Sequence, residues 1–143
     1  MHRRDIERPT AYLRKVRAAH AALKSTRGAV MAVAVIRPVL GSFEFAGIGN
    51  ISTVLITPDE LRRLPSTDGT VGYSVRTIRE QSYPWVPGSI LALSTDGLST
   101  RWNLAAHPGL HRRHPALIAG VIHRDFSRTN DDATIVVVKD EQA

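Results

Sequence analysis

The hydrophobic and polar positions of this chain divide it into short apolar runs separated by polar turns. Runs rich in Val, Ile, Leu and Ala predict β-strands, and Pro, Gly, Asn and Asp punctuate them. The run Ile90–Leu93 has no polar position, which is typical of a strand covered on both faces. In another run, Phe43 and Phe45 share one face and Glu44 takes the other. The predicted strands cover residues 28–36, 42–46, 51–57, 75–82, 90–93 and 134–139.

Two further segments have the spacing of amphipathic helices. In residues 9–24 apolar side chains recur on one face, and we expect that face to pack on a sheet. Residues 116–125 are predicted to be helical as well. The prolines at 58 and 65 leave room for at most a short helical turn, and residues 83–88 and 104–115 are predicted to be a turn and a loop. The mixture of strands and helices predicts an α+β domain.

Length and composition set broad bounds on the class of protein. The 143 residues predict a single domain, and 43% hydrophobic residues is ordinary for a globular protein. The absence of cysteine excludes disulfides and thiolate metal sites and is compatible with a reducing cytosol. No apolar span approaches the length of a membrane helix, and no signal core follows the basic start. We therefore expect a cytoplasmic protein without a membrane anchor.

The formal charge of +6 raises the question of an acidic partner. The basic residues gather within 3–24 and 112–128, and no aromatic side chains are interleaved to stack on bases. We therefore do not expect nucleic acid as the partner. A phosphorylated or acidic protein, or simply a solvated basic face, remains open.

Two acidic turns are the strongest candidates for chemistry. Asp96-Gly97 ends one buried strand, and Asn130-Asp131-Asp132 leads into another. An Asp-Gly pair taken alone is a common turn. Two carboxylate turns that each abut a buried strand can converge on one hard cation such as Mg²⁺ or Mn²⁺.

A kinase-like spacing competes with this interpretation. His123-Arg124-Asp125, with Asn130 five residues after the aspartate, has the spacing of a protein kinase catalytic loop. The chain has no glycine-rich loop before a strand lysine and no Asp-Phe-Gly. We therefore interpret Arg124 and Asp125 as charges at a helix end.

Histidines and serines offer two further alternatives. His107, His111 and His114 have a spacing that could gather zinc, but Pro108 and Gly109 interrupt any helix that would present them together. A serine nucleophile near the Asp-Gly turn lacks a glycine-flanked elbow. We interpret the histidines as part of a basic surface loop.

The order of these motifs resembles a known family. A strand and Thr95-Asp96-Gly97, followed about thirty-five residues later by Asp131-Asp132-Ala133-Thr134 and a strand, is similar to the C-terminal part of the metal-dependent (type 2C, or PPM) protein phosphatases. The nearer branch holds the stage II sporulation protein E phosphatases and the stressosome feedback phosphatases. Residues 43–50 resemble its strand–Ala-Gly-x-Gly-Asn turn, and residues 69–72 its Gly-Thr-x-Gly loop. The resemblance covers residues 27–139.

The resemblance implies a fold, a reaction and a site. The fold would be a β-sandwich flanked by helices (α-β-β-α). Two Mn²⁺ or Mg²⁺ ions would activate a water that hydrolyses phosphoserine or phosphothreonine. Asp96 and Asp131 match the metal ligands on which catalysis depends, and Gly97, Asn130 and Asp132 match neighbouring positions. The substrate would be a bacterial signalling regulator, such as an anti-sigma-factor antagonist or a stressosome component.

The chain departs from the family pattern at its beginning. The early aspartate and the Asp-Gly pair that supply the bridging ligand have no counterpart before Gly28, where the only aspartate is Asp5. We therefore expect residues 1–143 to be one phosphatase domain that lacks its N-terminal strands, with an open sheet edge that pairs with itself or with a complementing chain. Because half of the expected ligands are absent, the chain is either a phosphatase completed by another chain or a pseudophosphatase that binds a regulatory phosphoprotein.

Overall fold

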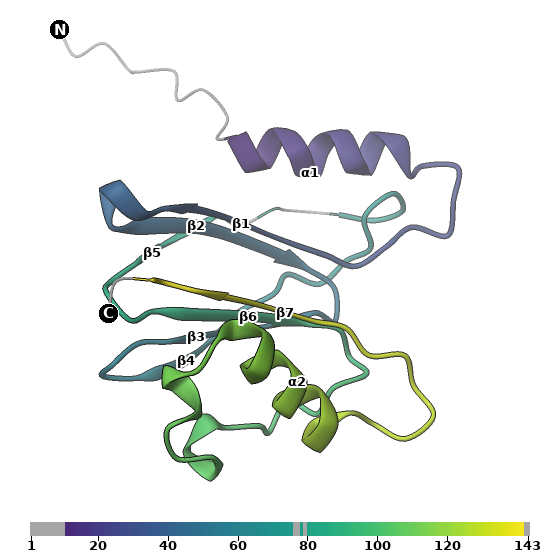
Figure 1. Ribbon diagram of the computed structural model, residues 1–143. Helices are drawn as coiled ribbons and strands as arrows, with labels where there is room; N and C mark the ends of the chain where they lie inside the picture. Colours follow the sequence, from purple (N-terminus) through teal and green to yellow (C-terminus); the bar gives the residue numbers. More distant parts are fainter. Residues whose placement is uncertain (1–10, 76–77, 79, 142–143) are drawn as a thin grey trace, which may run out of the picture.

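Two antiparallel sheets face each other, and one helix lies on the outer face of each (Figure 1). The computed structural model describes residues 11–75, 78 and 80–141. The three-stranded sheet has the order β1 (Met31–Arg37), β2 (Ser42–Ile48), β5 (Gln81–Pro84). The four-stranded sheet has the order β4 (Leu61–Leu64), β3 (Ser52–Ile56), β6 (Ile90–Ser94), β7 (Ile135–Lys139). The helices are α1 (Ala11–Ala22) and α2 (Pro115–Phe126), and the expected α-β-β-α sandwich is confirmed.

The first sheet begins with the expected hairpin. β1 and β2 pair antiparallel around a 3-10 turn, η1 (Pro38–Leu40), which ends at Gly41 in the left-handed region with φ 62°. Helix α1 packs on this sheet through Val16, which is buried against Ala46, Ile48 and Val71. The apolar face predicted for this helix therefore has the predicted role, although residues 9 and 10 lie outside the described residues.

The second sheet is built around β6. Ile90, Leu91 and Ala92 are buried and Leu93 is partly buried, which confirms the strand covered on both faces. One face of β6 packs under α2, where Ile118 and Ile122 are fully buried. The other face joins the core between the sheets.

Aromatic side chains fill much of that central core. Phe43 stacks on Tyr83 with ring centroids 5.3 Å apart and meets Trp85 edge-on at 5.8 Å. Each such pair adds about 0.5–1.5 kcal/mol beyond burial of its area. On the opposite face of β2, Glu44 pairs with Arg37 at 2.6 Å, as the alternation of the strand predicts.

Three local predictions were wrong or incomplete. Residues 61–64 form strand β4 rather than a helical turn, because the backbone N–H of Thr57 bonds the carbonyl of Glu60 at 2.9 Å and closes a hairpin. The strand expected at 75–82 is found at 81–84, so it overlaps the end of the predicted strand and continues into the predicted 83–88 turn, where Tyr83 pairs with Phe43; residues 76, 77 and 79 lie outside the described residues. Residues 104–115 are not an open loop, since η2 (Leu104–Ala106) and η3 (Leu110–Arg112) each bury a leucine.

Candidate functional site

The two acidic turns predicted from the sequence lie against each other. β6 and β7 are antiparallel neighbours with Ser94 opposite Ile135, so the turn after β6 and the turn before β7 share one end of the sheet. The backbone N–H of Thr95 donates to the carbonyl of Thr134 at 3.0 Å, and the N–H of Thr134 donates to Thr95 Oγ1 at 3.0 Å. The ladder thus continues past the strands and holds both turns in place.

The two acidic turns approach each other most closely at Gly97. A Cβ at this position would lie 2.0 Å from the backbone oxygen of Asp132, so no side chain fits there. The carbonyl of Gly97 accepts from the N–H of Arg128 at 2.8 Å, which ties the other end of the acidic loop to the same turn. Glycine is therefore required here by packing.

The Asp96 carboxylate projects to solvent and has one side-chain partner among the described residues, from the connection between β2 and β3. Asn50 Nδ2 donates to Asp96 Oδ2 at 2.6 Å. Asn50 follows β2 and precedes β3, so the site sits where the ends of both sheets meet. The sequence placed Asn50 in a family-like turn without a role. The sequence carries no local signal for this contact, because it follows from the pairing of β3 with β6, in which Ser52 lies opposite Ser94 and sets Asn50 beside Asp96.

The second turn carries two exposed carboxylates. Asp131 and Asp132 follow Asn130, whose φ of 70° places it in the left-handed region that Asn tolerates better than most residues. His123 Nε2 lies 3.2 Å from the carbonyl oxygen of Ala133 and links α2 to this loop. Within the part of the chain that the structure describes, neither carboxylate forms a hydrogen bond or ion pair with another side chain.

The donor set matches part of a hard-cation site. Carboxylate oxygens are the ligands that Mg²⁺ and Mn²⁺ prefer, and Asp96 and Asp131 present them at adjoining turns. Among residues 11–75, 78 and 80–141, however, no three His, Asp or Glu side chains gather closely enough to hold an ion. The described residues therefore fit a metal by chemistry and fall short by ligand number.

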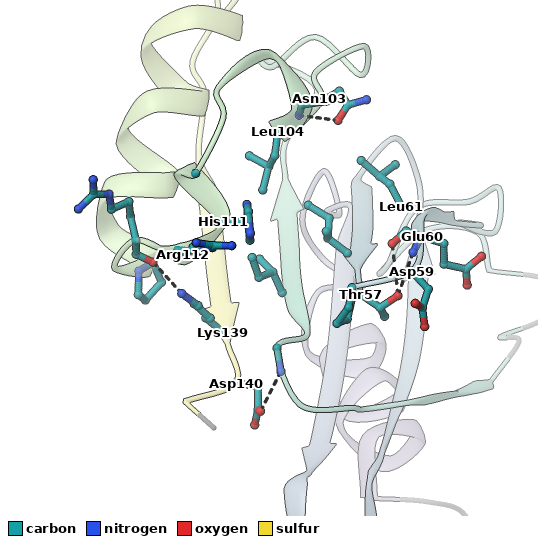
Figure 2. Close-up of a pocket in the computed structure, with 18 of the residues that line it drawn as sticks. Thr57, Asp59, Glu60, Leu61, Asn103, Leu104, His111, Arg112, Lys139 and Asp140 are labelled. Carbon is teal, nitrogen blue, oxygen red and sulfur yellow. Dashed lines mark hydrogen bonds between the residues drawn. The ribbon is translucent and has the colours of Figure 1, made fainter. Parts of the chain in front are cut away.

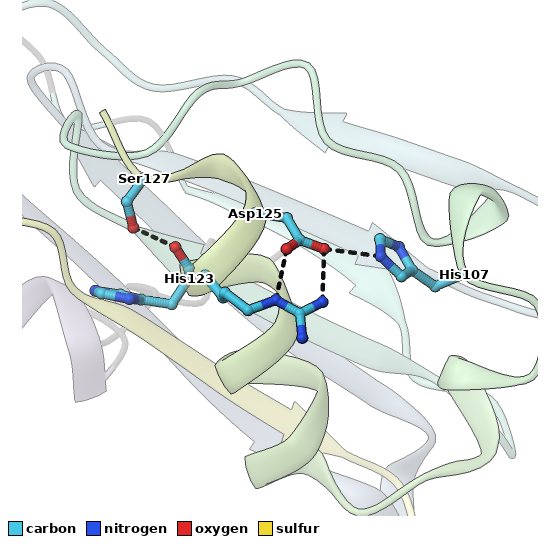
Figure 3. A network of polar contacts seen from close by, with 5 residues as sticks. His107, His123, Asp125 and Ser127 are labelled. Carbon is cyan, nitrogen blue, oxygen red and sulfur yellow. Dashed lines mark hydrogen bonds and ion pairs between the residues drawn. The ribbon is translucent and has the colours of Figure 1, made fainter. Parts of the chain in front are cut away.

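Asp125 belongs to a separate network on the end of α2 (Figure 3). Arg124 donates to Asp125 Oδ1 through Nε at 2.6 Å and to Asp125 Oδ2 through Nη2 at 3.1 Å, and His107 Nε2 lies 2.8 Å from the same Oδ2. The Arg124 hydrogen bonds chiefly, with the charges of Arg124 and His107, hold the pKa of the Asp125 carboxyl below its usual range. The network fastens the 104–115 segment to α2, so Asp125 is a structural charge.

The histidines of this segment have different contacts. While His107 faces Asp125, His114 caps α2 by accepting from the N–H of Ala116 at 3.1 Å. The hydroxyl of Ser127 caps the other end by bonding the His123 carbonyl (Figure 3).

A pocket of about 1460 Å³ lies at the opposite end of β6 (Figure 2). Its floor is apolar, and the β3–β4 turn, the 103–115 segment and the end of β7 form its walls. The imidazole of His111 points into it. With a rise of about 3.3 Å per residue, the Ile90 end of the strand is on the order of 20 Å from Asp96. The pocket is therefore distinct from the acidic turns.

A protein-family model identifies the family of this chain. The model of the stage II sporulation protein E (SpoIIE) family matches residues 2–140, and the chain belongs to that family of type 2C-like phosphatases. Comparison with curated protein sequences gave no match.

Solved structures support the same fold. A protein of the bacterial stressosome, a modular system adapted to control secondary messenger signalling, matches at 22% identity and TM-score 0.81, covering 90% of this chain and 68% of that one. RsbX in complex with magnesium matches at 21% identity and TM-score 0.71, covering 87% of this chain and 62% of its own. The phosphatase domain of SpoIIE from Bacillus subtilis matches at 15% identity and TM-score 0.60, covering 98% and 77%. This chain thus spans roughly two thirds of the length of its structural neighbours, and at these identities the likeness concerns the fold.

None of the helices in the described residues is both long and apolar enough to cross a membrane.

Proposed function

We propose that this chain is a metal-dependent phosphoserine/phosphothreonine protein phosphatase. The observation that carries the proposal is the contact between the Asp96-Gly97 turn and the Asp131-Asp132 turn, in a chain of the SpoIIE family. Those turns put oxygen donors at one end of a rigid sheet, which is where a hard cation would be held.

Each residue has a proposed role in that site. Asp96 and Asp131 are metal ligands, and the amide of Asn50 orients the Asp96 carboxylate through its hydrogen bond. Gly97 permits the close approach of the two turns, while Asn130 and Asp132 shape the loop around the second ligand. Bound Mn²⁺ or Mg²⁺, two ions in the family, would supply a water of lowered pKa and charge compensation for the phosphoryl oxygens.

The ligand number implies help from elsewhere. Two carboxylates are few for a pair of hard cations, because ligand number and charge set their affinity. In this proposal residues 1–143 form one domain, and a second copy or a complementing chain associates with the open side of the sandwich.

The proposed substrate is a phosphorylated signalling regulator in the cytoplasm. Support comes from the structural neighbours, which are named for the stressosome and for a cell fate determinant. An anti-sigma-factor antagonist or a stressosome component is the kind of phosphoprotein that we propose. The net charge of +6 favours a partner with an acidic surface.

A pseudophosphatase is the second candidate. The observation that favours it is the lack of a third metal-ligating side chain near Asp96 among the described residues. In that case the fold would bind a regulatory phosphoprotein without hydrolysing it.

The deciding experiment measures Mn²⁺-dependent hydrolysis of p-nitrophenyl phosphate and of a phosphothreonine peptide. Asp96→Asn is compared with Asp59→Asn, which removes another exposed carboxylate at the far end of the sheet. Loss of turnover and of Mn²⁺ binding in Asp96→Asn alone supports the phosphatase. Equal behaviour of both variants would remove Asp96 from a working metal site. No turnover at millimolar Mn²⁺ in the unaltered chain would overturn the proposal that the chain is active by itself, and would leave a phosphatase completed by a different chain or a pseudophosphatase.

A further inference from the structure

The two sides of the sandwich differ in how their edge strands are protected. On one side β4 lies over β5, with the Arg62 guanidinium 5.7 Å from the centre of the Tyr83 ring. These edges carry Arg62, Arg63 and Pro84, which are the residues that natural sheets use against edge pairing. On the other side, the edge strands are β1 and β7, and both consist mostly of apolar residues.

β7 is the more exposed of the two apolar edges. Val136 and Val138 are 52% and 37% exposed, and every residue of β1 is partly buried. The register sets these valines opposite Leu93 and Leu91, on the face that elsewhere forms the core between the sheets. These valines therefore lie on the core-forming face of the sheet and yet remain exposed. They also lie next to a strand edge that is unpaired in the described residues.

We infer that β7 pairs with β7 of a second copy of this chain, antiparallel about a twofold axis at Val137. Val136 of one copy then lies opposite Val138 of the other, twice, so that all four exposed valines pack in one cluster. The two four-stranded sheets become one continuous sheet of eight strands, and the unpaired edge disappears. The inference concerns assembly and does not depend on catalytic activity.

Charge placement favours this self-pairing. Residues 135–138 carry no charge, and the twofold register sets Lys139 opposite Ile135. The two Lys139 residues lie on the order of 14 Å apart along the strands, beyond the screening length of about 10 Å at 0.1 M salt. The same operation on β4 would oppose Arg62 with Arg63, which is unfavourable.

Residues 1–10, which lie outside the described part, do not offer a better occupant. Residues 1–10 contain five charged side chains, Arg3, Arg4, Asp5, Glu7 and Arg8, and only two large apolar ones. A strand lying on Val136 and Val138 needs apolar side chains at alternate positions. β7 of a second copy supplies them.

A charge-pair experiment tests the axis. Val136→Lys combined with Val138→Lys sets like charges opposite each other, whereas Val136→Lys combined with Val138→Glu sets opposite charges together with nearly the same loss of apolar area. By sedimentation velocity at 1–100 μM we expect a dimer of the unaltered chain, about tenfold or more weaker self-association of the Lys/Lys variant, and clear retention in the Lys/Glu variant. Val39→Lys, at a position 98% exposed in η1, is the control for added charge.

A disulfide experiment tests the same register without added charge. The chain has no cysteine, and the two Val137 residues would face each other at a distance that a disulfide can bridge. Under mild oxidation Val137→Cys should form a covalent dimer faster than Val136→Cys or Val39→Cys.

Three results would overturn the inference. They are a monomeric unaltered chain at 100 μM, equal association of the Lys/Lys and Lys/Glu variants, or equal cross-linking of the three cysteine variants. A monomer that binds only a different polypeptide at this edge would assign the valines to another partner and overturn the homodimer.

Discussion

Asn50 and Asp96, which are 46 residues apart in the chain, are joined by a hydrogen bond of 2.6 Å. The bond follows from sheet register, because β3 and β6 pair with Ser52 opposite Ser94 and the two side chains extend beyond that pair. A neutral amide that donates to a carboxylate fixes its orientation without neutralising its charge. This is what a metal ligand needs from a neighbour.

Removing the Asn50 amide should weaken metal binding at Asp96. We expect Asn50→Ala to lower Mn²⁺ affinity by about tenfold, the low end of what outer-shell partners contribute. Titration followed by the electron paramagnetic resonance of free Mn²⁺ measures this directly. Asn103→Ala is the matched control, because Asn103 caps η2 by accepting from the N–H of Ala105. Equal Mn²⁺ affinity of Asn50→Ala and the unaltered chain would remove Asn50 from the site.

Gly97 should be intolerant of even one added methyl group. In Gly97→Ala the new Cβ would meet the backbone oxygen of Asp132 at 2.0 Å, so the two acidic turns must separate. We expect a loss of about 1–3 kcal/mol in the free energy of unfolding, measured by urea denaturation.

Gly120→Ala provides the contrast for that loss. Gly120 lies within α2 and has open space around its Cβ position, so alanine should stabilise by up to about 1 kcal/mol through helix propensity. If both variants changed stability equally, the close contact of the two turns would be wrong.

The sequence was sufficient to predict the strands that consist of continuous apolar residues. β6 and β7 were recognised from continuous runs, and the turns at their adjoining ends led to Asp96 and Asp131. β4 was missed because Arg62 and Arg63 occupy half of its positions, and pairing with β3 rather than its own pattern makes it a strand. The predicted position of β5 was too early in the chain for a similar reason, because the stacking of Tyr83 on Phe43 places this strand.

The sequence pattern also did not predict contacts between segments that are distant in the chain. The hydrogen bond of Asn50 needs the β3–β6 register, and the pair of His107 with Asp125 needs the fold of the 104–115 segment onto α2. Neither is a local property of the chain. Sequence patterns therefore located the acidic turns and left their supports to the structure.

The core between the sheets should depend strongly on Phe43. Its ring is fully buried and contacts both Tyr83 and Trp85, so Phe43→Ala removes two aromatic pairs and leaves a cavity. We expect a loss of about 3–5 kcal/mol in the free energy of unfolding. Val39→Ala, at a side chain almost fully exposed, should change it by less than about 0.5 kcal/mol. Similar unfolding midpoints for the two variants would contradict this packing.

The network on α2 predicts the acid titration of Asp125. Arg124 is the main cause that lowers its pKa and His107 a lesser one, so Arg124→Gln should raise the Asp125 pKa more than His107→Gln does. Carboxyl ¹³C chemical shifts followed against pH report both midpoints.

The same shift fixes the sign of the pH dependence of stability. A carboxyl whose pKa is lower in the folded chain stabilises the fold above its unfolded pKa, and that contribution is lost as the pH falls through the folded pKa. The group is solvent-exposed, so the effect on unfolding should be small and should fade in high salt. An Asp125 midpoint unchanged by Arg124→Gln, or one that moves more with His107→Gln, would show that the bidentate Arg124 contact does not persist in solution.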